Sequence, residues 1–286
     1  MDPIKYEPFE DAQEFSDLMQ SLFKLFGLSE YATYPFSFLQ KSEDVKIICD
    51  DATSKKVEFV TPAGLEDALQ ESEMINSPKT NSGIPGAPDD SSWAGWTLNA
   101  IGSLLDGIDH SRVSRGESMF DGPLLGVLYE GLVAGSHRRV VGYRLYRHRP
   151  QHWALMIRDH TPLDSKKKDA KDYFLQSEIL GITAIFYRQM NEIKWDPWGH
   201  KFLPAQLTYK DGILTATIVT FLIGKVRVVQ ASCDPSQEHP EFKIALKGVY
   251  DLSLSCYNKA VFHEVVKWLL CPPDPARELP LRSRKA

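Results

Sequence analysis

The chain has few cysteines and no long apolar run. Its cysteines are scattered without a C-x-x-C pair, which argues against a disulfide framework and favours reduced thiols: Cys49, Cys233, Cys256 and Cys271. The acidic start, Met1-Asp-Pro-Ile-Lys-Tyr-Glu7, lacks an apolar segment, so we expect no secretory signal. Polar residues interrupt the apolar stretches near 179–187 and 213–229 before about 18 residues, so we expect no membrane insertion.

Common catalytic motifs are also missing. No Walker A loop, G-x-G-x-x-G or H-E-x-x-H motif occurs, which argues against the usual nucleotide-dependent and zinc-protease chemistries. The closest approach to the G-x-S-x-G of serine hydrolases, Gly116-Glu-Ser-Met-Phe120, fails at its last position. The sequence therefore indicates no particular cofactor, and we predict no metal site.

The composition is that of a globular protein. Of 286 residues, 43% are hydrophobic and 25% are charged, close to the globular average. The net charge of −5 argues against a protein that coats nucleic acid over its whole surface, so any such contact has to be local. We expect a cytoplasmic protein, with the nucleus as the alternative compartment.

One segment, residues 76–92, differs in character from the rest of the chain. It is rich in proline, glycine, serine and asparagine and has almost nothing to bury. We therefore predict an N-terminal α+β region over 1–75, a flexible loop or linker over 76–92, a C-terminal domain of antiparallel sheet and helices over 93–275, and a basic tail over 276–286. Whether the linker separates two independent domains stays open.

Hydrophobic periodicity predicts the elements of the fold. Helical spacing of apolar residues predicts helices over 9–26, 172–193 and 258–270. Strand patterns include 45–49, 56–60, 139–147, 152–158, 206–210, 213–222 and 226–231, and Asp211-Gly212 suits a tight hairpin turn. Because short turns join consecutive strands, we expect an α+β fold with a mostly antiparallel sheet and helices packed on one face.

The densest group of reactive side chains lies between His137 and His160. It holds six arginines and four of the eight histidines, opposed only by Asp159. Alternation over 139–147 and 152–158 predicts a hairpin with one buried and one polar face. The alternative is a solvated strand pair whose arginines face acidic residues elsewhere. We predict a non-catalytic binding or accessory protein whose basic hairpin face holds an anionic small molecule or an acidic protein surface through Arg144, Arg147, His148, His152 and Arg158.

An enzyme acting near His152 is the first alternative. His152-Trp-Ala-Leu resembles the histidine strand of papain-like lipid acyltransferases and peptidases. The resemblance implies an acid–base or cysteine-dependent enzyme, with Cys256, just before the predicted helix, as the nucleophile paired with His152. Apolar Leu252 and Leu254 favour a buried structural thiol at Cys256 instead.

A metal-dependent nuclease is the second alternative. It needs carboxylates on adjacent strands, followed by a lysine, to hold a divalent cation. Asp50 and Glu58 lie on or near neighbouring predicted strands, but Val60 stands where the lysine is expected. The histidines of the hairpin also lack a recognised metal-ligand spacing.

Residues 207–268 resemble uncharacterised, lineage-restricted fungal proteins. In those proteins, as here, apolar strands such as 213–221 and 226–231 precede a final tryptophan-bearing helix. The resemblance covers the C-terminal half and carries over no site residues. It implies an intracellular fungal protein that is an accessory to a specialised pathway. Apart from this resemblance, nucleic acid is a less favoured partner of the basic hairpin.

Overall fold

The structure, a computed structural model, describes residues 6, 8–61, 65–71, 99, 101, 113–114, 121–134, 138–161, 163, 167, 169–253, 255–273 and 275. The predicted linker over 76–92 and the tail over 276–286 lie outside them. The fold is α+β, as predicted. Its helices are α1 (Ala12–Leu28), α2 (Phe36–Leu39), α3 (Leu65–Glu71), α5 (Pro123–Glu130), α7 (Gln176–Met190) and α8 (Lys259–Leu270). None of the helices described is both long and apolar enough to cross a bilayer.

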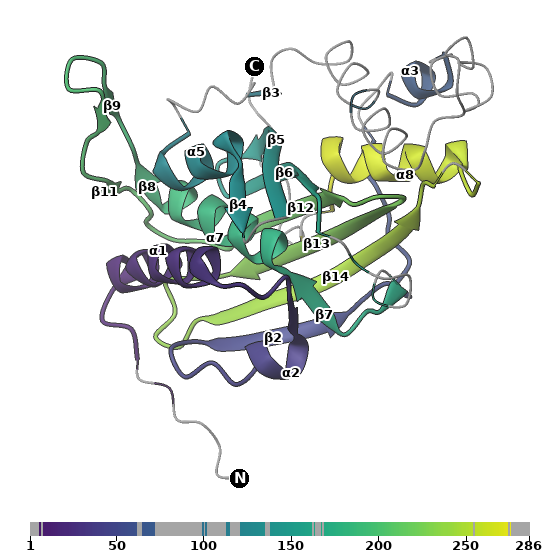
Figure 1. Cartoon of the computed structure of the whole chain (residues 1–286). Helices are drawn as coiled ribbons and strands as arrows, with labels where there is room; N and C mark the ends of the chain where they lie inside the picture. The colour runs from purple at the N-terminus through teal and green to yellow at the C-terminus, as the bar shows by residue number, and fades with distance from the viewer. Residues whose placement is uncertain are drawn as a thin grey trace.

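One large mixed sheet forms the centre of the molecule (Figure 1). Its order is β2 (Lys46–Asp51), β14 (Glu241–Asp251), β13 (Lys225–Cys233), β12 (Leu214–Phe221), β6 (His152–Asp159), β5 (Arg138–Arg149) and β3 (Val113–Ser114), with β4 (Leu132–Ala134) also on β5. Most pairs are antiparallel, but β12 with β6 and β14 with β2 run parallel. Since β2 precedes residues 76–92 in the chain, the described residues on both sides of that segment share one sheet.

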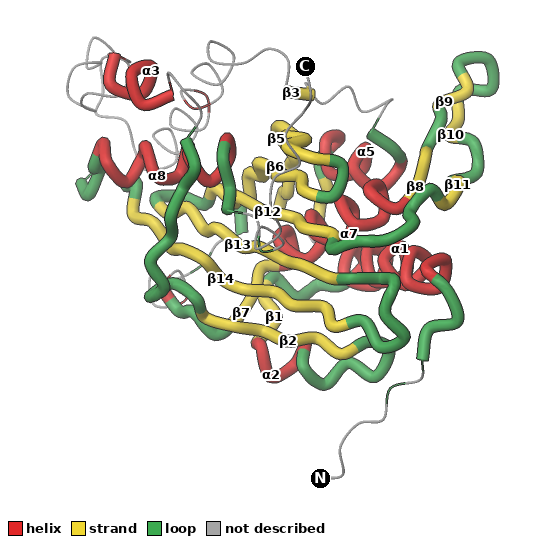
Figure 2. Tube along the Cα trace, turned by 180° about the vertical axis from the view of Figure 1, so that it is seen from behind, coloured by secondary structure: helices red, strands yellow, loops and turns green. Residues whose placement is uncertain are grey.

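Three small antiparallel pairs account for the other strands of the described residues. They are β1 (Thr33–Pro35) with β7 (Tyr173–Leu175), β9 (Trp195–Asp196) with β10 (Lys201–Phe202), and β8 (Asn191–Glu192) with β11 (Gln206–Leu207). The β8–β11 segment extends away from the body of the protein (Figures 1 and 2).

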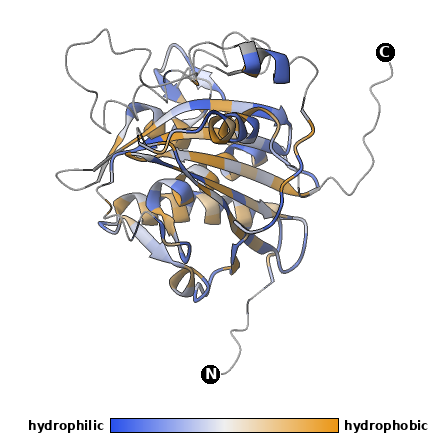
Figure 3. Ribbon diagram, turned by 90° about the vertical axis from the view of Figure 1, so that its right-hand side faces the viewer, coloured by the Kyte–Doolittle hydropathy of each residue, from blue (hydrophilic) through white to orange (hydrophobic). Residues whose placement is uncertain are grey.

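Helices cover both faces of the sheet. The predicted layer on one face consists of α1, α5 and α7, which share a hydrophobic core with the sheet. The structure adds α8 on the opposite face, where Phe262, Val265 and Trp268 pack on sheet residues such as Val219 and Val228. The central strands are therefore apolar on both sides, and Figure 3 shows hydrophobic residues along them.

Close contacts hold α7 to the sheet. A Cβ on Gly181 would come within 2.9 Å of Ile218 Cδ1 and 3.0 Å of Ile157 Cδ1, so the helix can approach this closely only with glycine there. At the start of the helix, the fully buried Arg227 of β13 donates from Nε to Glu178 Oε1 at 2.8 Å. Burial raises the pKa of Glu178 although Arg227 acts to lower it.

Two predicted elements are absent for physical reasons. Residues 56–60 form no strand, because the chain leaves the sheet at Ala52, whose N–H donates to Leu246 O at 2.9 Å, and runs on toward α8. The predicted hairpin around Asp211-Gly212 is wrong as well. Gly212 has the positive φ of a turn glycine (99°), but β11 pairs with β8 while β12 pairs with β13 and β6.

Candidate anion-binding site

The predicted hairpin exists, but it does not present a single basic face. β5 and β6 pair antiparallel, with register shifts at Tyr143 and His148. Arg147 lies on the α5/α7 side of the sheet, against Trp153. His152 lies on the α8 side, where its Nε2 is 3.1 Å from Thr217 Oγ1. The basic cluster of the sequence is thus divided between two faces that are both largely buried.

Arg147 is a structural partner of a buried acid. Its guanidinium forms an ion pair with Asp121, whose side chain is 1% exposed, and stacks over Trp153 with Cζ 4.6 Å from the ring centroid. Arg188 of α7 approaches the same ring at 6.0 Å. Burial raises the pKa of Asp121, and the charges of both arginines act against that rise. Arg147 therefore stabilises the fold and is committed to an internal carboxylate.

The histidines belong to a second, internal group. His148 lies between the Tyr146 ring, at 6.4 Å between centroids, and the His152 ring, at 5.5 Å. Thr217 joins His152 to Gln230, which in turn donates to Pro273 O at 2.7 Å. His152 is therefore enclosed beneath the chain that follows α8.

The remaining two predicted ligand residues are half-buried. Arg144 lies with its Cζ 5.7 Å from the Tyr143 ring centroid. Arg158 pairs with Val141 in β5 and with Phe221 in β12. The five predicted ligand residues consequently do not converge on one binding surface.

The structure does not bring Cys256 to His152. His152 is linked through Thr217 and Gln230 to the residues after α8, whereas Cys256 precedes that helix. A helix of 12 residues spans about 18 Å at 1.5 Å per residue, so the two side chains lie near its opposite ends. Cys256 is also exposed, so its predicted burial is wrong.

The nuclease arrangement is not assembled either. Asp50, at the end of β2, binds Lys55 Nζ at 2.8 Å, and Glu58 is exposed on a segment without secondary structure. Among the described residues no three histidine, cysteine or acidic side chains come together as metal ligands. The described carboxylates near β2 therefore do not form a metal centre.

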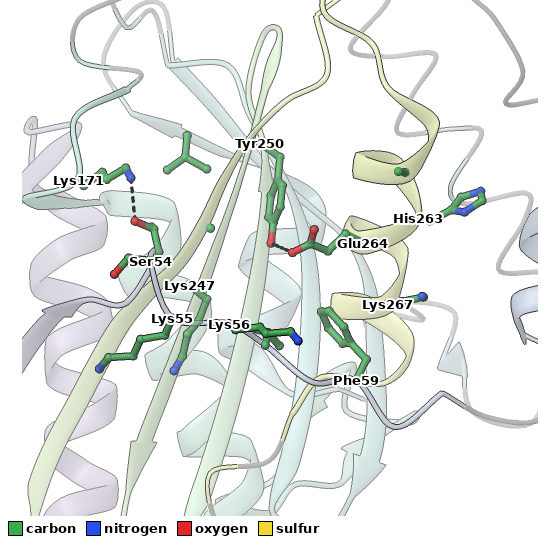
Figure 4. Close-up of a pocket in the computed structure, with 15 residues that line it drawn as sticks. Ser54, Lys55, Lys56, Phe59, Lys171, Lys247, Tyr250, His263, Glu264 and Lys267 are labelled. Atoms are coloured by element: carbon green, nitrogen blue, oxygen red, sulfur yellow. Dashed lines mark hydrogen bonds between the residues drawn. The ribbon is translucent and has the colours of Figure 1, made fainter.

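A different basic site lies where β14 extends beyond the end of β2. We call it the lysine pocket: a cavity of about 600 Å³ between the strap 53–59, β14 and α8. Four separate parts of the chain contribute its lysines, which are Lys55, Lys56, Lys171, Lys247 and Lys267. Figure 4 shows Lys55 and Lys247 side by side, with Lys171 approaching from another segment. Among the residues that the structure describes, Glu264 is the one carboxylate that lines the cavity.

Local sequence fixes the strap that closes the pocket. Asp51 accepts hydrogen bonds from Thr53 N at 3.0 Å and from Thr53 Oγ1 at 2.7 Å, which turns the chain out of β2. Lys171 Nζ donates to Thr53 Oγ1 at 2.8 Å and ties the strap to the segment before β7. At its far end Phe59 packs edge-on against Trp268, with centroids 5.3 Å apart.

A tyrosine forms the rigid wall of the pocket. Tyr250 OH donates to Glu264 Oε1 and accepts from Trp268 Nε1, both at 2.7 Å. A Cβ on Gly248 would overlap the Tyr250 ring, so glycine is required where the ring crosses the strand. Because Glu264 is already bonded to Tyr250, the described lining of the cavity combines several cations with one carboxylate that is already hydrogen-bonded.

The charges in the pocket affect one another. Burial lowers the pKa of Lys247, the charge of Lys55 lowers it further, and Asp50 acts in the opposite direction. Burial likewise lowers the pKa of His263, helped by Lys259 and Lys267. A bound anion would relieve this crowding of positive charge.

Sequence reasoning missed the lysine pocket because its lysines come from positions 55 to 267 without local density. The available signal was Lys247-Gly-Val-Tyr250, a glycine inside a strand pattern, which is typical of a bulge or close backbone approach.

Comparisons with protein-family models, with curated proteins and with solved structures find no match for this chain. The resemblances to fungal proteins and to papain-like enzymes stay predictions. Function therefore has to be inferred from the geometry of the site.

Proposed function

We propose that the protein binds a small anionic ligand in the lysine pocket and acts as a binding or accessory protein without turnover. The supporting observation is the convergence of lysines from the strap, from the segment before β7, from β14 and from α8 on one cavity of about 600 Å³. The net charge of the chain is −5, so this local excess of positive charge runs against the charge of the whole molecule. Such a cavity concentrates anions by electrostatics.

Two lysines contribute most to this binding in our proposal. Lys56 is exposed at the pocket wall, and Lys171 is held over the strap by its bond to Thr53. Lys267 contributes less, because Glu66 Oε1 lies 2.5 Å from its Nζ. An anion that receives hydrogen bonds from two or three ammonium groups is the ligand class that fits.

Titration calorimetry of the full chain with inorganic phosphate, pyrophosphate and citrate tests the proposal. We expect saturable binding of at least one anion that weakens as salt is added. A hydrogen bond to a charged group contributes about 1.5 kcal/mol or more, so Lys56→Gln or Lys171→Gln should weaken binding roughly tenfold. Lys24→Gln, on the α1 face of the sheet, removes the same charge and should bind like the wild type.

The proposal fails if none of the three anions binds. It fails equally if the two pocket variants and Lys24→Gln show the same affinity, because the anion would then bind somewhere else.

A further inference from the structure

Lys247 differs from the other lysines of the pocket. Lys55 and Lys267 form ion pairs and Lys171 donates to a hydroxyl. Lys56 is exposed. Lys247 is half-buried, and its ammonium forms no hydrogen bond or ion pair with the part of the chain that the structure describes.

The backbone places Lys247 at an irregularity of the sheet. Leu246 pairs with Val229 and Gly248 with Val228, so Lys247 is the extra residue of a β-bulge. A bulge redirects the side chain of its extra residue. On the other edge β2 ends opposite Leu246, so Lys247 is the first residue of β14 beyond the paired segment. Its position is therefore set by strand pairing on both sides.

The neighbours of Lys247 favour a neutral amine. Lys55, which is next to it in Figure 4, brings positive charge from the strap and acts with burial to lower the pKa of Lys247. Among the described residues, Asp50 at the end of β2 opposes this effect, but it is ion-paired with Lys55. Glu264 of α8 is bonded to Tyr250. A half-buried amine next to another cation is the arrangement that activates lysine nucleophiles.

We propose that Lys247 is an amine nucleophile that captures a small carbonyl compound bearing an anionic group, such as a 2-oxo acid or a phosphorylated aldehyde. The inference rests on the proposed function, because Lys56 and Lys171 would hold the anionic group while the carbonyl meets Lys247.

The chemistry needs no additional reactant. The Nζ lone pair attacks the carbonyl carbon, the C–N bond forms as the C=O π bond breaks, and a proton moves from nitrogen to oxygen to give a carbinolamine. Loss of water then gives the imine, so amine plus carbonyl compound yields imine plus water. The step is reversible, and hydrolysis releases the ligand unchanged.

Reductive trapping with glyoxylate is the direct test. The full chain is treated with glyoxylate and cyanoborohydride near neutral pH, and adducts are assigned to individual lysines by peptide mass spectrometry. We expect Lys247 to react several-fold faster than two lysines on the same sheet. Lys243 is exposed on the same strand and is ion-paired with Glu241 at 3.1 Å. Lys225 is also half-buried, but hydrogen bonds to Asp251 and Asp169 raise its pKa although burial acts to lower it.

Two further arms test the role of the anion. Pyrophosphate should slow trapping at Lys247 and leave Lys243 unaffected, and propionaldehyde, which has no charge, should lose the preference for Lys247. Lys247→Arg keeps the positive charge without an amine nucleophile, so it should lose the pocket adduct and still bind pyrophosphate.

Trapping at Lys247 no faster than at Lys243 would overturn this inference. If pyrophosphate still binds in that case, the anion-binding function survives and the amine chemistry alone fails. An equal preference of propionaldehyde for Lys247 would overturn the anionic part of the ligand class.

Discussion

Replacement of Arg227 by methionine should strongly destabilise the protein. Arg227 and Glu178 are both fully buried, and the guanidinium also donates from Nη2 to Tyr173 O at 2.8 Å. Methionine fills much of the same volume but leaves the Glu178 carboxylate with only the Leu175 N–H, at 2.7 Å, as a described donor. Removing one partner of a buried ion pair costs about 3–5 kcal/mol. That is a large part of the 5–15 kcal/mol by which proteins are typically stable.

The loss should also depend on pH in a defined direction. Burial raises the pKa of Glu178, and Arg227 opposes that rise, so Arg227→Met should raise the pKa in the folded protein further. Consider a carboxyl group whose pKa is higher in the folded protein than in the unfolded chain, where it is about 4.3. Its full contribution to stability is present below pH 4.3, and that contribution is lost as the pH rises through the higher pKa of the folded protein. The deficit of Arg227→Met relative to the wild type should therefore be smaller at pH 5 than at pH 8.

Urea unfolding at both pH values measures this effect. The double variant Glu178→Gln/Arg227→Met removes both charges of this pair, so it should recover part of the stability and lose the added pH dependence. Arg158→Met makes the same substitution at a half-buried arginine of β6 and should cost much less. A loss that is the same at pH 5 and pH 8, or one no larger than that of Arg158→Met, would refute the reasoning.

Three other substitutions or reactions have defined outcomes. Arg147→Ala should lower the free energy of unfolding, measured in urea, by about 1–3 kcal/mol. The loss should be near the lower end of this range because the Arg147 side chain is 37% exposed. Unchanged stability would contradict its ion pair with the buried Asp121. Exposed Cys256 should react with iodoacetamide well before buried Cys233, as followed by peptide mass spectrometry, because burial raises the pKa of the Cys233 thiol well above its usual value. The reverse order of reaction would contradict the structure. Gly248→Ala should cost about 1–3 kcal/mol in thermal unfolding and weaken pyrophosphate binding, because its Cβ displaces Tyr250; wild-type values for both would exclude that contact.

Elements with a local cause were predictable from the sequence. The last helix begins where expected, because Asn258 accepts a hydrogen bond from Ala260 N at 2.8 Å as a cap. The β5–β6 hairpin follows from alternation on both strands. The partners of β2 and β12 were not predictable, since parallel pairing with β14 and β6 joins residues far apart in sequence and leaves no local pattern.

The predicted basic face shows how charge density along a chain differs from charge density on a surface. Adjacent residues of a strand point to opposite faces, so Arg147 and His148 could be neighbours in sequence and still serve different layers. Arg147 forms an ion pair with the buried carboxylate of Asp121 on one face of the sheet. His148 lies against the rings of Tyr146 and His152 on the other face. The sequence of the hairpin alone could not predict that α8 packs on the face of the sheet that holds the histidines.

The lysine pocket depends on the opposite effect, in which distant residues become neighbours because a strand ends. β2 leaves β14 after Leu246, the bulge turns Lys247 out, and the strap brings Lys55 back beside it. No one of these steps requires a lysine, because a strand end, a bulge and a turn form equally well with neutral side chains. Burial, and then the charge of Lys55, lower the pKa of Lys247, while Asp50 acts in the opposite direction. In the function that we propose, a bound anion would offset the positive charge beside Lys247 and so stabilise the protein that carries it.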